Sequence, residues 1–166
     1  MASANSTSGV KQEQAAAIAL TVLRVGVGAV MAVHGWAKLS DIAGTAQSFE
    51  QLGLPAPRLL VCLAIAGEFL GGLGLSAGLL TRVAALGPLC TMLVAILTVH
   101  LGHGLLAKNG GYEYPLVLLL VSGFFAFNGA GPWSLDAQLW QRKLGHRRAT
   151  RRAFFHHAPH QRHDVV

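Results

Sequence analysis

One apolar stretch decides the fold of this chain. Residues 59–80 read LLVCLAIAGEFLGGLGLSAGLL, which is long enough to cross a hydrocarbon core of about 30 Å as a helix rising about 1.5 Å per residue. A single carboxylate, Glu68, lies near the middle of this stretch. Because an ionised side chain in hydrocarbon costs on the order of 3 kcal/mol or more, Glu68 needs a partner, water or a function.

The composition of the whole chain is that of a membrane protein. Of its 166 residues 52% are hydrophobic and 12% are charged, whereas about 25% of a soluble domain is charged. Further apolar runs of spanning length cover residues 15–33, 83–99 and 114–133. We therefore predict an all-α integral membrane four-helix bundle. The first run is interpreted as a retained helix, because neither a basic n-region nor a small-residue cleavage site flanks it.

Three segments are expected: a flexible N-terminus (residues 1–11), a four-helix domain (12–140) and a basic, histidine-containing cytoplasmic tail (141–166). Between the first two spans, residues 40–54 predict a short interfacial or re-entrant helix, with Asp41 as its cap and Gly53 as its stop. Another short amphipathic helix is predicted after Ser134, a good N-cap residue.

Lysine and arginine are unevenly divided between the two sides of the predicted bundle. Four spans place both termini on one side, and that side carries most of the positive charge. The positive-inside rule therefore predicts cytoplasmic termini. This topology explains the isoelectric point of about 10.0, so membrane lipids are the expected partner and nucleic acid is not. The inner side has Lys11, Arg82, Arg142, Lys143, Arg147, Arg148, Arg151 and Arg152, and the outer side Lys38, Arg58 and Lys108.

A second intramembrane charge, Arg24, lies inside the first apolar run. Counted from the expected ends of the spans at about 1.5 Å per residue, Arg24 and Glu68 come to nearly the same depth. We therefore predict that they form an ion pair and are the candidate catalytic residues. Two interpretations remain open: the pair fastens two helices together, or it lines a polar pocket for a substrate, a quinone or a proton.

Small residues around Glu68 predict close helix packing. Gly67, Gly71, Gly74 and Gly78 recur every three or four positions, and the first span contributes Gly26, Gly28 and Gly35. Such spacing lets a neighbouring backbone approach closely, although membrane helices are in general rich in glycine. Cys62 and Cys90 fall near opposite membrane faces and are not expected to pair.

Four residues near the outer ends of the spans, His34, Lys38, His100 and Glu113, are candidate ligand-binding residues. Histidine together with Lys38 and Arg24, as donors at the edge of an apolar cavity, could bind the carbonyl oxygens of a quinone or an anion such as an oxidised sulfur compound. A facing His34/His100 pair could instead ligate haem, and these histidines with His103 and Glu113 could hold a metal. Interfacial histidines more often bond to backbone or water, so no metal site is predicted. ATP-driven and covalent chemistry have no support, because the chain has no Walker loop, dinucleotide fingerprint, nucleophile elbow or CxxC pair.

Several blocks, taken in order, resemble the DoxX family of small four-helix bacterial membrane proteins. The resemblance covers about residues 17–137. The blocks are Arg24, HGWAKL (34–39), Phe49 with the loop 53–57, EFLGGLGLSAGLLTR (68–82), GGYEYPL (110–116) and GAGPWSLD (129–136). The resemblance implies a plasma-membrane bundle with both termini inside and a link to membrane redox systems, among them thiosulfate:quinone oxidoreductase subunits and oxidative-stress or sulfur enzymes. It also implies that the polar positions of the family are Arg24, His34, Lys38, Glu68, Arg82 and Glu113.

The function predicted from these observations is that of an integral membrane subunit of a quinone-linked oxidoreductase or of a redox-stress or sulfur-oxidation system. Its partner would be a redox protein or a second copy of the chain, and its cofactor a quinone or a bound haem. The alternatives are a small-molecule or ion permease and a non-catalytic membrane scaffold for redox enzymes. Whether the chain is itself catalytic stays open at this point.

Overall fold

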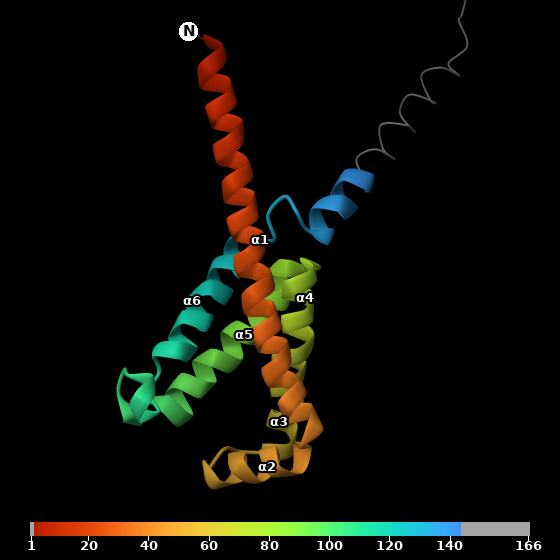
Figure 1. Cartoon of the computed structure of the whole chain (residues 1–166). Helices are drawn as coiled ribbons and strands as arrows, with labels where there is room; N and C mark the ends of the chain where they lie inside the picture. Colours follow the sequence, from red (N-terminus) through yellow and green to blue (C-terminus); the bar gives the residue numbers. More distant parts are fainter. Residues whose placement is uncertain (1, 144–166) are drawn as a thin grey trace, which may run out of the picture.

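Helices run through nearly all of the described part of the chain, residues 2–143, with side chains described from residue 8 onward (Figure 1). This computed structural model is all-α, as predicted. Its elements in order are α1 (Ala2–Ser40), α2 (Ile42–Gln51), α3 (Pro57–Ile65), the π-helical turn η1 (Ala66–Leu70), α4 (Gly71–Ala77), α5 (Thr81–Ala95), the π-helical turn η2 (Ile96–His100), the 3₁₀ turns η3 (Leu101–His103) and η4 (Ala107–Asn109), α6 (Glu113–Asn128) and a helix over residues 135–143.

Three helical segments are long and apolar enough to cross a membrane: Ser8–Ser40, Pro57–Ala77 and Thr81–His103. They correspond to the first three predicted spans. The fourth, α6, is shorter than predicted and ends at Asn128. It ends there because Gly129 takes a φ of +81°, which is incompatible with a continuing helix.

The two ends of the chain were predicted to be less ordered than the bundle. The helix α1 already begins at Ala2, so residues 2–11 are helical; their flexibility stays a prediction. Of the basic tail, residues 141–143 continue the last helix, and residues 144–166 lie outside the described residues.

The short helix between the first two spans is confirmed as α2. Its N-cap is Asp41, whose Oδ1 accepts a 2.9 Å hydrogen bond from the Gly44 amide. The chain leaves the helix through Gly53, which has a φ of +71°, and Pro57 then occupies the first turn of α3, where its missing N–H costs nothing.

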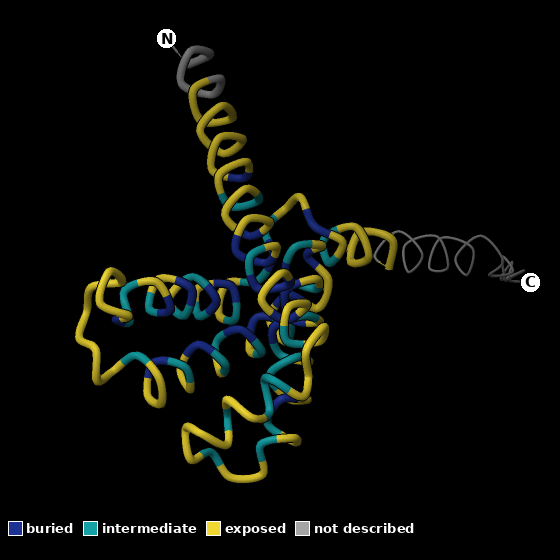
Figure 2. Tube along the Cα trace, turned by 60° about the horizontal axis from the view of Figure 1, so that its bottom comes forward, coloured by how far each residue is buried: buried dark blue, intermediate teal, exposed yellow. Residues whose placement is uncertain are grey.

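The long helices pack in sequence order: α1 against α4, α4 against α5, and α5 against α6. Two arms result, one of α1 with α3 and α4 and the other of α5 with α6. Figures 1 and 2 show that the arms meet at one end and spread apart toward α2, which lies across the N-terminal end of α3. Buried Met31, Leu75, Met92 and Phe125 belong to the core where the arms meet.

Glycines bring the helices into backbone contact, as predicted. A Cβ on Gly72 of α4 would lie 2.5 Å from the Ala32 amide of α1, and one on Gly67 would lie 3.3 Å from the Gly87 Cα of α5. Gly26 is different, because a Cβ there would meet nothing within 4 Å. The glycine positions that matter are therefore those at helix crossings.

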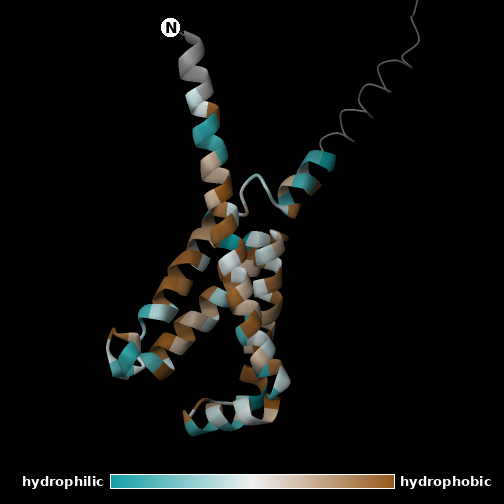
Figure 3. Cartoon of the chain, in the orientation of Figure 1, coloured by the Kyte–Doolittle hydropathy of each residue, from teal (hydrophilic) through white to brown (hydrophobic). Residues whose placement is uncertain are grey.

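Large apolar side chains cover the outside of the helices. Leu59, Leu70, Val83, Leu120 and Phe127 are all more than half exposed, and hydrophobic residues continue along both arms in Figure 3. In water such a surface would be unfavourable, whereas in a bilayer it faces lipid.

Candidate functional site

The buried carboxylate Glu68 is held by an ion pair with Lys38. Lys38 Nζ, from the last turn of α1, lies 2.5 Å from Glu68 Oε2. Glu68 is only 3% exposed, whereas the side chain of Lys38 is 25% exposed. Because removing one partner of such a pair leaves an uncompensated buried charge, the two residues depend on each other.

Glu68 lies in a break of regular α-helix. The π-helical turn η1 contains it and joins α3 to α4, and a second π-helical turn, η2, ends at His100. Both turns contribute side chains to one cavity. π-helical turns interrupt otherwise regular helices and are frequent at functional sites. Because two of them meet at one cavity, we take this cavity as the candidate functional site.

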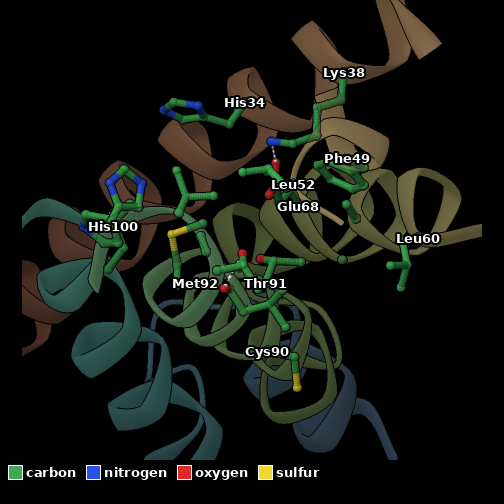
Figure 4. Close-up of a pocket in the computed structure, with 18 of the residues that line it drawn as sticks. His34, Lys38, Phe49, Leu52, Leu60, Glu68, Cys90, Thr91, Met92 and His100 are labelled. Atoms are coloured by element: carbon green, nitrogen blue, oxygen red, sulfur yellow. Dashed lines mark hydrogen bonds and ion pairs between the residues drawn. The ribbon is translucent and has the colours of Figure 1, made fainter. Parts of the chain in front are cut away.

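The cavity has a volume of about 870 Å³ and lies between the two arms. That volume is in the range of small-molecule and cofactor sites. Its wall is mainly apolar and includes Phe49 and Leu52 near α2, Met92 on α5 and Leu118 on α6. Its polar side chains are His34, Lys38, Glu68, Thr91, Thr98, His100 and Tyr114, several of which are labelled in Figure 4.

Two histidines lie on one side of the ion pair (Figure 4). His34 is exposed and its ring centroid lies 6.4 Å from that of Tyr114. His100 Nδ1 lies 2.7 Å from the Gly110 carbonyl oxygen. Since a carbonyl can only accept, Nδ1 of His100 carries the proton, and Nε2 is the ring nitrogen that can exchange a proton with a ligand.

The predicted ion pair between Arg24 and Glu68 is wrong. The Arg24 guanidinium donates to three backbone carbonyls: Nη1 to Leu75 (2.9 Å) and Ser76 (3.0 Å), and Nη2 to Trp133 (2.9 Å). The depth estimate failed because α1 continues to Ser40, well past the predicted end of the span. Lys38 is therefore still helical beside Glu68, and Arg24 lies fourteen residues earlier, about 21 Å along the helix axis.

Arg24 instead belongs to a clamp at the opposite end of the bundle. The carboxylate of Asp136 accepts from the backbone amides of Leu80 (2.7 Å) and Thr81 (2.9 Å), which begin α5, and its own amide donates to the Gly78 carbonyl. Arg24, the end of α4, the start of α5 and the segment after α6 thus meet in one place, which we call the Arg24–Asp136 clamp. Sequence reasoning missed Asp136; its position two residues after the cap Ser134 was the available signal.

The clamp also sets the protonation of Asp136. Burial acts to raise the pKa of this carboxyl, but hydrogen bonds from Thr81 and Leu80 and the positive charge of Arg24 outweigh it, so the pKa lies below its ordinary value. The predicted cap at Ser134 is confirmed next to it, because the Ala137 amide donates to Ser134 Oγ at 3.1 Å.

Glu113, the first residue of α6, holds the preceding loop through a hydrogen bond. Its Oε1 accepts a 2.7 Å hydrogen bond from the Ala107 amide, and its neighbour Tyr114 lines the cavity. The structure therefore brings His34, Lys38, Glu68 and His100 together at one cavity, with Glu113 occupied in a loop and Arg24 in the clamp. Their roles as binding or catalytic residues stay predictions.

Within the described residues, no three side chains of histidine, cysteine, aspartate or glutamate gather closely enough to hold a metal ion. His103, a member of the weighed metal set, has its Nδ1 3.0 Å from the Val99 carbonyl oxygen. Cys62 and Cys90 are both free, in agreement with the prediction that they do not pair.

Known proteins match most of this chain. "Putative oxidoreductase CatD" of Bacillus subtilis (strain 168) is 34% identical over 126 residues, which are 76% of this chain and 90% of that protein. "Inner membrane protein YqjF" of Escherichia coli (strain K12) is 33% identical over 125 residues, 74% of this chain and 92% of that protein. No solved structure matches. The DoxX family profile matches residues 19–101, and the chain, a multi-pass membrane protein, belongs to the DoxX family.

Proposed function

We propose that this protein is the membrane subunit of a quinone-linked oxidoreductase and that its cavity binds the quinone head group. One observation carries the proposal: a partly buried Lys38–Glu68 ion pair lies on the wall of a mainly apolar cavity of about 870 Å³. An intramembrane ion pair is costly and marks a functional site by default. The oxidoreductase name of the relative CatD supports the redox class.

In this proposal Lys38 and Glu68 have complementary roles. The ammonium of Lys38 donates a hydrogen bond to one quinone oxygen, which stabilises the negative charge that develops there on reduction. Reduction to the quinol takes two electrons and two protons. Glu68 relays the protons: its carboxylate first takes up a proton from the aqueous side and then passes it to the head group. His100, through Nε2, is a second relay group beside the ion pair, because Nε2 can accept a proton and then pass it to the head group.

The electrons come from a partner in this proposal. The sequence has neither a dinucleotide fingerprint nor a CxxC pair, so in this proposal a partner redox protein supplies them, directly or through a bound haem. We further propose that both termini face the cytoplasm, since the lysine and arginine residues outside the spans are concentrated on that side.

Replacing the acid tests the proposal. Glu68→Gln keeps the size of the side chain but removes its ability to carry a proton. Quinone reduction by membranes containing the variant should therefore fall by about a hundredfold, which is the lower end of the contribution of one general acid. Glu50→Gln on α2, where Glu50 is exposed, is the matched control and should leave turnover unchanged. Unchanged turnover of Glu68→Gln contradicts the proton-delivery role.

A further inference from the structure

We infer that the side of the cavity between α3 and α5 holds the isoprenoid tail of a lipid-soluble quinone, which enters laterally from the bilayer. This inference rests on the proposed function and names its substrate class. The residues concerned are Leu60 and Leu63 of α3 and Leu86 and Val94 of α5, which all line the cavity and are called the tail groove below.

The ion pair divides the cavity into two unlike parts. Figure 4 shows His34 and His100 on one side of Glu68 and Leu60 on the other. The histidine side offers hydrogen-bonding groups, whereas the tail groove is aliphatic, with Cys90 and Thr91 of α5 beside it. A ligand with a polar head and a long apolar chain matches this division, because its head can lie at Lys38 and Glu68 while its chain follows the tail groove.

The base of the tail groove is a helix crossing without side chains. Gly67 and Gly87 both line the cavity at the place where η1 approaches α5. A Cβ on Gly67 would lie 3.1 Å from Thr91 Cγ2 and 3.3 Å from the Gly87 backbone. Larger residues at these positions would therefore separate the helices, whereas the two glycines let η1 and α5 come into backbone contact and form the floor of the groove.

The tail groove is open on the lipid side. Leu63 is 56% exposed, Leu86 47% and Val94 49%, although all three line the cavity. They belong to the spans Pro57–Ala77 and Thr81–His103, so the space outside them is hydrocarbon. A ligand already dissolved in the bilayer can therefore move its head group between α3 and α5 without passing through water. A quinone without a tail would not need this lateral opening.

Photolabelling in nanodiscs tests the inference. The probe is a decyl dimethoxybenzoquinone that carries a diazirine on its tail. On illumination it should label residues 57–65 and 86–95 above the background on lipid-facing helix surfaces. Excess tail-less dimethoxybenzoquinone should remove that labelling by displacing the head. Leu63→Trp, which fills the tail groove, should lower it by about fivefold. Leu73→Trp is the matched control on the same span and should leave it unchanged, because Leu73 is 47% exposed and outside the cavity lining.

The outcomes separate the two ideas. If these segments are labelled, and the labelling is lowered by Leu63→Trp and removed by the tail-less quinone, the result supports both the tail groove and the proposed quinone function. Uniform labelling of all lipid-facing surfaces, while the tail-less quinone still protects Lys38 from chemical modification, overturns the tail groove and leaves the head site standing. If decanol displaces the probe from the tail groove and the tail-less quinone does not, the proposed quinone function is overturned.

Discussion

Arg24 should be essential for stability and dispensable for quinone chemistry. It is 2% exposed and donates three hydrogen bonds to backbone carbonyls of α4 and of the segment after α6. Arg24→Met removes all three and takes the positive charge away from Asp136, although the Leu75 carbonyl still accepts a 3.1 Å hydrogen bond from the Gly78 amide. Breaking a buried charge network by removing one partner costs about 3 to 5 kcal/mol. We expect the lower end, about 3 kcal/mol, because Asp136 keeps its two amide hydrogen bonds.

The free energy of unfolding in detergent micelles measures this cost directly. A loss of about 3 kcal/mol corresponds to roughly a hundredfold change in the unfolding equilibrium constant. Turnover with quinone, normalised to folded protein, should not change. Arg82→Met is the matched control, since Arg82 is an exposed arginine at the same end of the bundle and should cost less than about 1 kcal/mol. An Arg24→Met variant of wild-type stability that has lost turnover would refute this reasoning and return Arg24 to the active site.

The clamp, the helix crossings and the topology give three more predictions. Gly72→Ala should destabilise the bundle by about 1 to 3 kcal/mol because its Cβ meets the α1 backbone, while Gly26→Ala should change stability by less than about 1 kcal/mol; equal effects in thermal unfolding would contradict the packing argument. Since the pKa of Asp136 is lowered in the folded protein, the wild-type free energy of unfolding should hold at neutral pH and decline as pH falls below the ordinary pKa of about 3.9. Asp136→Asn should be less stable than wild type at neutral pH, and the difference in the free energy of unfolding between the two should narrow in acid. Reporter fusions at both ends of the chain should be active only in the cytoplasm, and a periplasmic signal from either end would reverse the proposed topology.

Local signals in the sequence predicted most of the fold. Apolar run length located the spans, and Asp41 and Ser134 identified two helix starts because capping depends on nearby residues only. The choice of partner for Glu68 was wrong because it depended on depth, and depth depends on where a helix ends. Hydropathy falls at His34 and Lys38, so the first span was ended too early, whereas α1 stays helical to Ser40, with Gly35 against Phe69 and Lys38 paired with Glu68 of η1.

The sequence identified four of the cavity's polar residues but also named Arg24 and Glu113, which do not line it, and it did not predict the geometry. His34, Lys38, Glu68 and His100 were all named from the sequence, and all four line one cavity. The two π-helical turns that bring Glu68 and His100 to it have no sequence signature, since they add one residue to a turn without a special residue type. Asp136 was missed because its partners, the first amides of α5, lie more than fifty positions away in sequence.

Infrared difference spectroscopy of a quinone labelled with ¹³C at one carbonyl tests most directly whether the head group binds at Lys38 and Glu68. In wild-type protein the labelled carbonyl stretch should shift to lower frequency than in lipid alone, because the Lys38 ammonium donates to that oxygen, and in Lys38→Met the shift should disappear. A wild-type spectrum identical to that of the quinone in lipid would contradict the account.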